Sequence, residues 1–176
     1  ELLERVDEGT RPLFEAYKRD LDARLAERFG VAVGELRPWH YSDPFFQEAP
    51  AAEIDLDPWF KGKDLEALTR AYFEAVGFDI DGLLARSDLY ERDGKCQHAF
   101  CIHMDRRDDI RVLANLRPTE YWMNTMLHEF GHAVYDQGLD PSLPYFLRGA
   151  AHTLTTEAAA MLLGRLSRNA DWLIAY

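Results

Sequence analysis

The feature that most restricts the fold of this chain is the segment His128-Glu129-Phe130-Gly131-His132, an H-E-x-x-H pattern. Two histidines four positions apart share one face in an α-helix, about 6 Å apart along its axis. That spacing lets both imidazoles reach one Zn²⁺. In a chain with 6 histidines, chance would produce the pattern about 0.02 times. The segment therefore predicts a helix with two zinc ligands, and the alternative is a pair of surface histidines.

A catalytic zinc site also needs a third protein ligand and an open position for water. The extended metzincin pattern would place Gly and His where this chain has Tyr135 and Gly138, so that class is excluded. The other common third ligand is a glutamate on a following helix, and Glu157 is the only glutamate after Glu129. An acidic side chain within an apolar helix needs a partner, which zinc would supply. A solvated surface glutamate is the alternative.

The residue between the two ligands predicts chemistry. Zinc lowers the pKa of coordinated water to about 7, which gives a nucleophile at neutral pH. Glu129 follows His128 and can reach that water without being a ligand, so we expect it to act as the general base in hydrolysis of a peptide bond.

Hydrophobic periodicity predicts a mainly α fold with a small antiparallel β hairpin at the edge. The hairpin is expected from two β-prone runs, 99–104 and 110–116, separated by a polar turn. Residues 34–58 contain several prolines and aromatic residues, and we expect an ordered loop packed on the core. Helices are predicted where apolar residues recur every three or four positions, in 10–29, 64–76, 118–138 and 152–168.

The segment His128–His132 followed by Glu157 and Ala158 resembles the gluzincins, the zinc peptidases with two His ligands and one Glu ligand. Residues 143–148 are similar to the angiotensin-converting-enzyme family, and H-E-F-G-H also resembles thimet oligopeptidase and oligoendopeptidase F relatives. The resemblance covers about residues 95–165. It implies a zincin-like, helical peptidase whose two lobes enclose a channel for oligopeptide substrates.

The same resemblance gives the hairpin a role. In such peptidases an edge strand beside the metal pairs with the extended substrate. Residues 95–101 match that strand, so His98 is expected to bind substrate, and Ala99 and Cys101 to contact it through backbone groups. The alternative is a core strand with a hydrogen-bonded histidine. The other histidines, His40, His103 and His152, have no motif around them and are expected to be structural.

Two departures from the converting-enzyme pattern limit the resemblance. That family has an aspartate four residues after the ligand Glu, where this chain has Met161, so Asp136 is the candidate to support His132. The family's Tyr and His that stabilise the oxyanion lie well beyond Glu157, outside this segment. A peptidyl-dipeptidase is favoured. The alternatives are an oligoendopeptidase and, in another class, a non-catalytic zinc-binding or structural protein.

The charge and the ends of the chain give weaker expectations. A net charge of −11 argues against nucleic acid or an anionic membrane as the partner. Two cysteines, expected to be unpaired on opposite faces of one strand, fit a reducing, cytoplasmic location. The chain starts at Glu1 and ends in an apolar run. We therefore expect 1–176 to be the metal-binding portion of one catalytic domain, truncated at both ends and partnered by its own polypeptide beyond Tyr176.

Overall fold

The structure, a computed structural model, describes residues 1–41 and 54–176. It contains two compact units, one within residues 1–53 and one formed by residues 54–176, which are described separately below. No helix among the described residues is long and apolar enough to cross a membrane.

The N-terminal unit is built on one long helix, α1 (Leu2–Phe29), followed by the short 3-10 turns η1 (Val33–Glu35) and η2 (Pro38–His40). The predicted end is confirmed, since Gly30 closes α1 with a left-handed φ of 64°. The predicted start at residue 10 is wrong, and Pro12 lies inside the helix. An internal proline removes only one backbone donor, and an i,i+4 ion pair between Asp7 and Arg11 spans the turn before it.

Part of the predicted loop 34–58 lies outside the described residues, namely 42–53. In the part before them, Trp39 is 76% exposed. The prediction that this segment packs on the core is therefore wrong for Trp39. In the part after them, Ile54 is 72% exposed, and Leu56 is partly buried and packs against the core, so the prediction holds only for Leu56.

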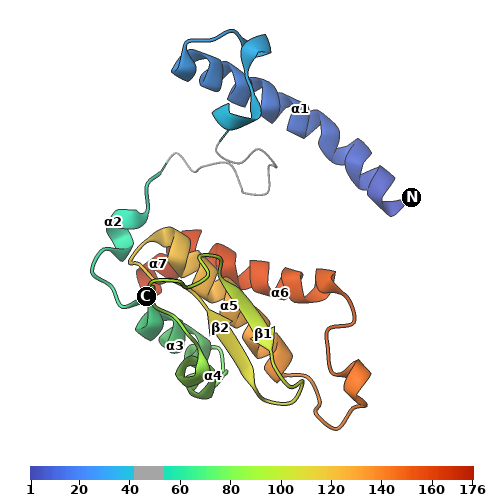
Figure 1. The fold of residues 1–176 in the computed structure, drawn as a ribbon, viewed down its shortest axis with the longest axis vertical. Coiled ribbons are helices and arrows are strands. Elements are labelled where there is room, and N and C mark those ends of the chain that lie inside the picture. The colour runs from blue at the N-terminus through green and yellow to red at the C-terminus, as the bar shows by residue number, and fades with distance from the viewer. Residues whose placement is uncertain (42–53) are drawn as a thin grey trace. The chain divides into compact units, whose positions relative to one another are not determined.

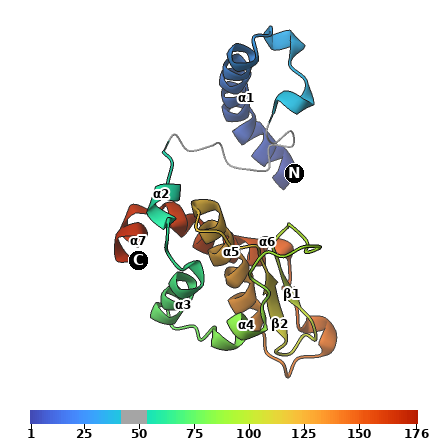
Figure 2. The same ribbon diagram turned by 60° about the vertical axis from the view of Figure 1, so that its left-hand side comes forward.

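The second unit is mainly helical with one small sheet, which confirms the predicted fold class (Figure 1). Its long helix α5 contacts α6, both strands and α3 (Figure 2). The elements are α2 (Asp57–Phe60), α3 (Leu65–Ala75), α4 (Asp81–Arg86), β1 (Phe100–His103), β2 (Ile110–Leu113), α5 (Glu120–Gln137), η3 (Tyr145–Leu147), α6 (Thr153–Gly164), η4 (Arg165–Arg168) and α7 (Ala170–Ala175).

The boundaries of these helices have local causes. The Asp64 side chain accepts from the backbone N–H of Ala67 and caps α3. Helix α5 begins at Glu120, two residues beyond the predicted start at Pro118, and the hydroxyl of Thr119 caps it by accepting from the N–H of Trp122. The predicted helix 152–168 changes to a 3-10 turn after Gly164. Helices α2, α4 and α7 are not predicted, because each is too short to show a periodic pattern.

The hairpin is antiparallel, as predicted, with Cys101 opposite Val112 and His103 opposite Ile110. Ile110 and Val112 are buried in the core, whereas Phe100 and Ile102 are exposed. The two cysteines are free, as predicted. They do not share a strand, however, because Cys96 lies before β1 begins.

Helix α5 supplies the centre of the core. The fully buried side chains Met123, Met126, Leu127 and Phe130 lie at steps of three and four residues, which confirms the predicted helical periodicity. The ring of Phe130 packs against that of Phe73 of α3 in a tilted arrangement, with ring centroids 6.3 Å apart. The metal-binding motif is therefore part of the best-packed helix of the unit.

Candidate metal centre

Three side chains from two helices converge on one point. Nε2 of His128 and Nε2 of His132, on α5, are 3.2 Å apart. The carboxylate of Glu157, on α6, lies 3.6 Å from Nε2 of His128 and 3.5 Å from Nε2 of His132. Among the described residues, this is the one group of three or more His, Cys, Asp or Glu side chains that could hold a metal ion. The structure thus brings together the three predicted ligands.

These distances and donor types fit zinc. Ligand atoms about 2.0–2.1 Å from a tetrahedral Zn²⁺ lie about 3.3 Å from one another, close to the 3.2 Å between the two Nε2 atoms. Oε2 of Glu157 lies 3.6 Å from Nε2 of His128, and Oε1 lies 3.5 Å from Nε2 of His132. Two imidazoles with one carboxylate form a common catalytic ligand set. Burial lowers the pKa of His128, and the charge of His132 lowers it further. The charge of Glu157 has the opposite, smaller effect. The neutral imidazole that results is the form that binds a metal.

Close contact between α5 and α6 explains why the glutamate can reach the histidines. A Cβ added at Gly131, between the two histidines in sequence, would lie 2.9 Å from Cα of Ala160. A Cβ added at Gly164 would lie 3.3 Å from Cβ of His128. Because both positions lack a side chain, the helix backbones approach closely, and Glu157, one turn before Ala160, faces the imidazoles.

Glu129 lies beside this centre and is half-buried. Burial raises the pKa of its carboxyl to about 7, and the charge of Glu157 acts in the same direction. A backbone hydrogen bond from Cys101 and the nearby His98 oppose the rise. A carboxyl that titrates near neutral pH can both accept and release a proton there.

Strand β1 forms one wall of the site. The N–H of Met104 donates to the carbonyl of Asp109 at 2.8 Å, so these two residues form a hydrogen-bonded pair. Along an antiparallel ladder, hydrogen-bonded pairs alternate with pairs that are not hydrogen-bonded. The backbone groups of Phe100 and Ile102 therefore face β2, whereas those of Ala99 and Cys101 face the other edge. Within the described residues the sheet has two strands, so this edge has no neighbouring strand. The geometry is compatible with the predicted peptide contacts, which stay predictions.

The side chains of this wall have distinct environments. His98 is exposed, and its Nδ1 lies 2.8 Å from the carbonyl oxygen of Ala99. Burial raises the pKa of the Cys101 thiol to about 12, with smaller effects from Asp136 and Glu129. Cys101 is therefore a neutral thiol, and its backbone N–H donates to the carboxylate of Glu129.

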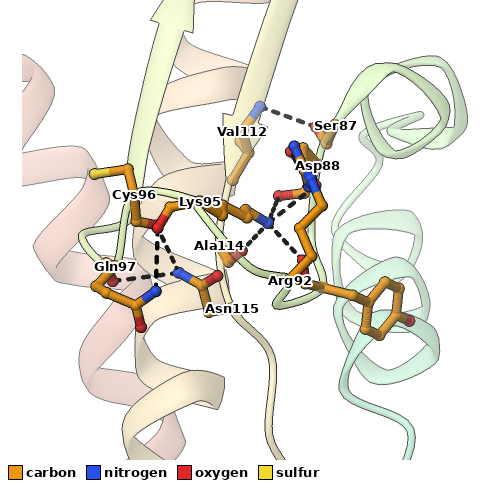
Figure 3. A network of polar contacts seen from close by, with 10 residues as sticks. Ser87, Asp88, Arg92, Lys95, Cys96, Gln97, Val112, Ala114 and Asn115 are labelled. Carbon is orange, nitrogen blue, oxygen red and sulfur yellow. Dashed lines mark hydrogen bonds and ion pairs between the residues drawn. The ribbon is translucent and has the colours of Figure 1, made fainter.

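A buried lysine holds the segment that leads into β1. The Lys95 side chain is 1% exposed, and its ammonium donates to the Asp88 carboxylate and to the carbonyls of Asp88, Tyr90 and Ala114 (Figure 3). Next to it, the amide of Asn115 donates to the carbonyls of Cys96 and Gln97 at 3.0 and 3.3 Å. These contacts fix the backbone just before His98.

The support of His132 differs from the prediction. Its Nδ1 lies 2.7 Å from Oγ1 of Thr156 on α6, and Asp136 acts on His132 only through its charge. Met161, at the position of the converting-enzyme aspartate, is 63% exposed and supports nothing in the site. Thr156 directly precedes the ligand Glu157, and this adjacency is the one sequence signal that could have indicated it.

The remaining histidines make local contacts. The Nδ1 atoms of His40 and His152 accept backbone hydrogen bonds, from Arg37 at 2.9 Å and from Leu154 at 3.0 Å. His103 is largely buried beside Asp105, and its Nε2 has no hydrogen-bond partner among the described residues. None of the three belongs to the metal-binding group.

Comparison with protein families gives one match. The model of the carboxypeptidase Taq (M32) metallopeptidase family matches residues 14–163, which include all three converging side chains. No curated protein matches the chain. The finer resemblance to the converting-enzyme and thimet oligopeptidase families stays a prediction.

Proposed function

Because the chain belongs to the carboxypeptidase Taq (M32) metallopeptidase family, a family of zinc-dependent hydrolases of peptides, we propose that it removes residues from the C-terminal ends of oligopeptides. Membership of an enzyme family also argues against the alternative of a non-catalytic zinc protein. The family's name favours release of single residues over the dipeptides expected from the converting-enzyme resemblance.

Each residue of the site has a role in this proposal. His128, His132 and Glu157 would hold the zinc, and their mutual spacing of 3.2 to 3.6 Å is the observation that carries the proposal. Bound zinc supplies a Lewis acid that polarises the scissile carbonyl and acidifies water. The carboxylate of Glu129 takes the proton of the attacking water and delivers it to the leaving nitrogen. A purely structural zinc site would have no use for this group.

The substrate would lie along β1. Its extended main chain would pair with the edge of β1 that faces away from β2 and carries the backbone groups of Ala99 and Cys101, of which the N–H of Cys101 donates to Glu129. His98 would donate to the substrate from the same edge. Two observations support this arrangement: the electrostatic interaction between His98 and Glu129, and the backbone hydrogen bond from Cys101 to Glu129. Both connect the strand to the proposed general base.

The roles of ligand and base can be separated by substitution. Glu129→Gln should keep one zinc per chain and lose peptide hydrolysis by at least about 100-fold, since general base catalysis contributes about 10²–10⁴-fold. Glu157→Gln should lose zinc as well. Glu74→Gln, at an exposed position of α3, is the matched control and should change neither. Near-normal hydrolysis by Glu129→Gln would refute the proposed base.

The cleavage mode is tested by mass spectrometry of digested oligopeptides. The proposal expects single residues to leave peptides with a free C-terminal carboxylate, and no cleavage of the same peptides with an amidated end. Release of dipeptides would instead identify a peptidyl-dipeptidase. Internal cleavage of amidated peptides would identify an oligoendopeptidase, and either result would overturn the proposed carboxypeptidase mode.

A further inference from the structure

A hydrogen bond joins α5 and α6, the two helices of the metal centre. It involves Nδ1 of His132, the ring nitrogen that does not face the metal-binding group. Nδ1 of His132, on α5, lies 2.7 Å from Oγ1 of Thr156, on α6. Both side chains are half-buried, which limits competition from water. Thr156 is adjacent to Glu157, so one turn of α6 contacts the same imidazole through a hydroxyl and through a carboxylate.

The two contacts have different chemical demands. A neutral imidazole carries one proton, and a nitrogen can ligate a metal only if it has none. Nε2 is the nitrogen of His132 that faces His128 and Glu157, so the proton must be on Nδ1. The hydroxyl oxygen of Thr156 has lone pairs that can accept a hydrogen bond from this N–H. With Thr156 as acceptor, the lone pair of Nε2 is directed toward the shared centre.

We propose that Thr156 is a positioning residue that fixes the tautomer and the orientation of His132 for metal binding. The inference rests on the proposed zinc centre. In many zinc sites a carboxylate or a backbone carbonyl has this role. Here a neutral hydroxyl has it, whereas Asp136, one turn after His132 on α5, interacts with the ring through its charge alone. The hydroxyl also couples the ring to the helix that bears the third ligand.

The test compares substitutions that keep or remove the hydroxyl. Thr156→Val preserves the shape of the side chain and removes the acceptor, whereas Thr156→Ser keeps the acceptor. Thr155→Val is the matched control on the preceding residue, since its hydroxyl bonds the carbonyl of His152 at 2.7 Å and the hydroxyl of Tyr135 on α5 at 3.3 Å rather than the metal centre. Zinc dissociation constants are measured on the full chain by competition with a chromophoric chelator, and melting temperatures on the metal-free chain.

We expect Thr156→Val to weaken zinc binding about 10–100-fold, and Thr156→Ser to stay within about threefold of the unsubstituted chain. Thr155→Val should leave zinc affinity unchanged. A merely structural role would lower the melting temperature of the metal-free Thr156→Val chain without a selective loss of zinc affinity. Zinc binding by Thr156→Val within twofold of the unsubstituted chain would overturn the proposal.

A spectroscopic measurement covers the case in which the valine variant does not fold. In the zinc-loaded chain labelled with ¹⁵N-histidine, His132 should carry its proton on Nδ1, and the Thr156→Ser chain should give the same spectrum. A proton on Nε2 of His132 would overturn the proposal. If His132→Ala binds zinc as tightly as the unsubstituted chain, the zinc centre itself is wrong, which separates the two failures.

Discussion

Replacing Gly131 with alanine should weaken zinc binding even though alanine favours helices. The added Cβ would lie 2.9 Å from Cα of Ala160 and 3.2 Å from Cδ1 of Leu163. Leu163 can rotate, but the first contact is with backbone, so α5 and α6 must separate by about 0.5–1 Å to reach normal van der Waals distance. Glu157 lies one turn from Ala160 and would move with it.

Two energies compete in this substitution. Alanine gains about 1 kcal/mol over glycine in a helix interior. Overpacking a tight interface costs about 1–3 kcal/mol. The free energy of unfolding should therefore fall by about 0–2 kcal/mol. The metal site tolerates less, because a constellation of ligands must hold its geometry within about 0.5 Å. Zinc affinity should fall by at least about tenfold.

The assay is urea unfolding of the metal-free chain together with zinc titration. Gly82→Ala is the matched control in the same unit, because its new Cβ would meet only the flexible end of Arg86, at 3.3 Å. It should leave zinc affinity unchanged and stability equal or slightly higher. If the Gly131→Ala chain has unchanged zinc affinity and is at least as stable as the unsubstituted chain, this reasoning about Gly131 is wrong.

Three further predictions concern β1 and the segment before it. Lys95→Met should lower the free energy of unfolding by about 3–5 kcal/mol in urea titrations, because three carbonyls and the Asp88 carboxylate lose the buried ammonium. A loss below about 1 kcal/mol would contradict this prediction. Arg92, then Lys95, hold the pKa of Asp88 below its ordinary value, so this carboxylate stabilises the fold above the unfolded pKa of about 3.9 and loses that effect as pH falls through the folded pKa. The stability gap between the unsubstituted chain and Asp88→Asn should therefore be larger at pH 7 than at pH 3, and an equal gap would exclude this contribution. In the native chain at pH 8, exposed Cys96 should react with a thiol reagent while Cys101, whose pKa burial raises to about 12, reacts far more slowly; two equally fast thiols would contradict the structure.

The metal-binding helix could be predicted because its sequence pattern reflects local geometry. The spacing of His128 and His132 and the apolar positions around Phe130 require the same helical period, so motif and fold agree. The hairpin was predictable for a similar reason, since two β-prone runs flank one polar turn. In these cases the decisive interactions lie within a few residues along the chain.

Apart from the third ligand Glu157, contacts between distant segments were not predictable. Asp136 was expected to support His132 because it follows one turn later on the same helix, but the contact comes from Thr156 on α6, and its position depends on how two helices cross. Lys95 resembles a surface residue in sequence, because lysine is seldom buried. Its partners are mostly backbone carbonyls of segments that converge only after folding. The start of α1 was also missed, since the helix begins at Leu2 and contains Pro12.

The zinc centre is tested most directly by anomalous diffraction at the zinc absorption edge from crystals of the zinc-loaded chain. We predict one strong peak about 2.0–2.2 Å from Nε2 of His128, Nε2 of His132 and a carboxylate oxygen of Glu157. A peak elsewhere in the unit, or a peak on the two histidines with Glu157 turned away, would contradict the proposed ligand set.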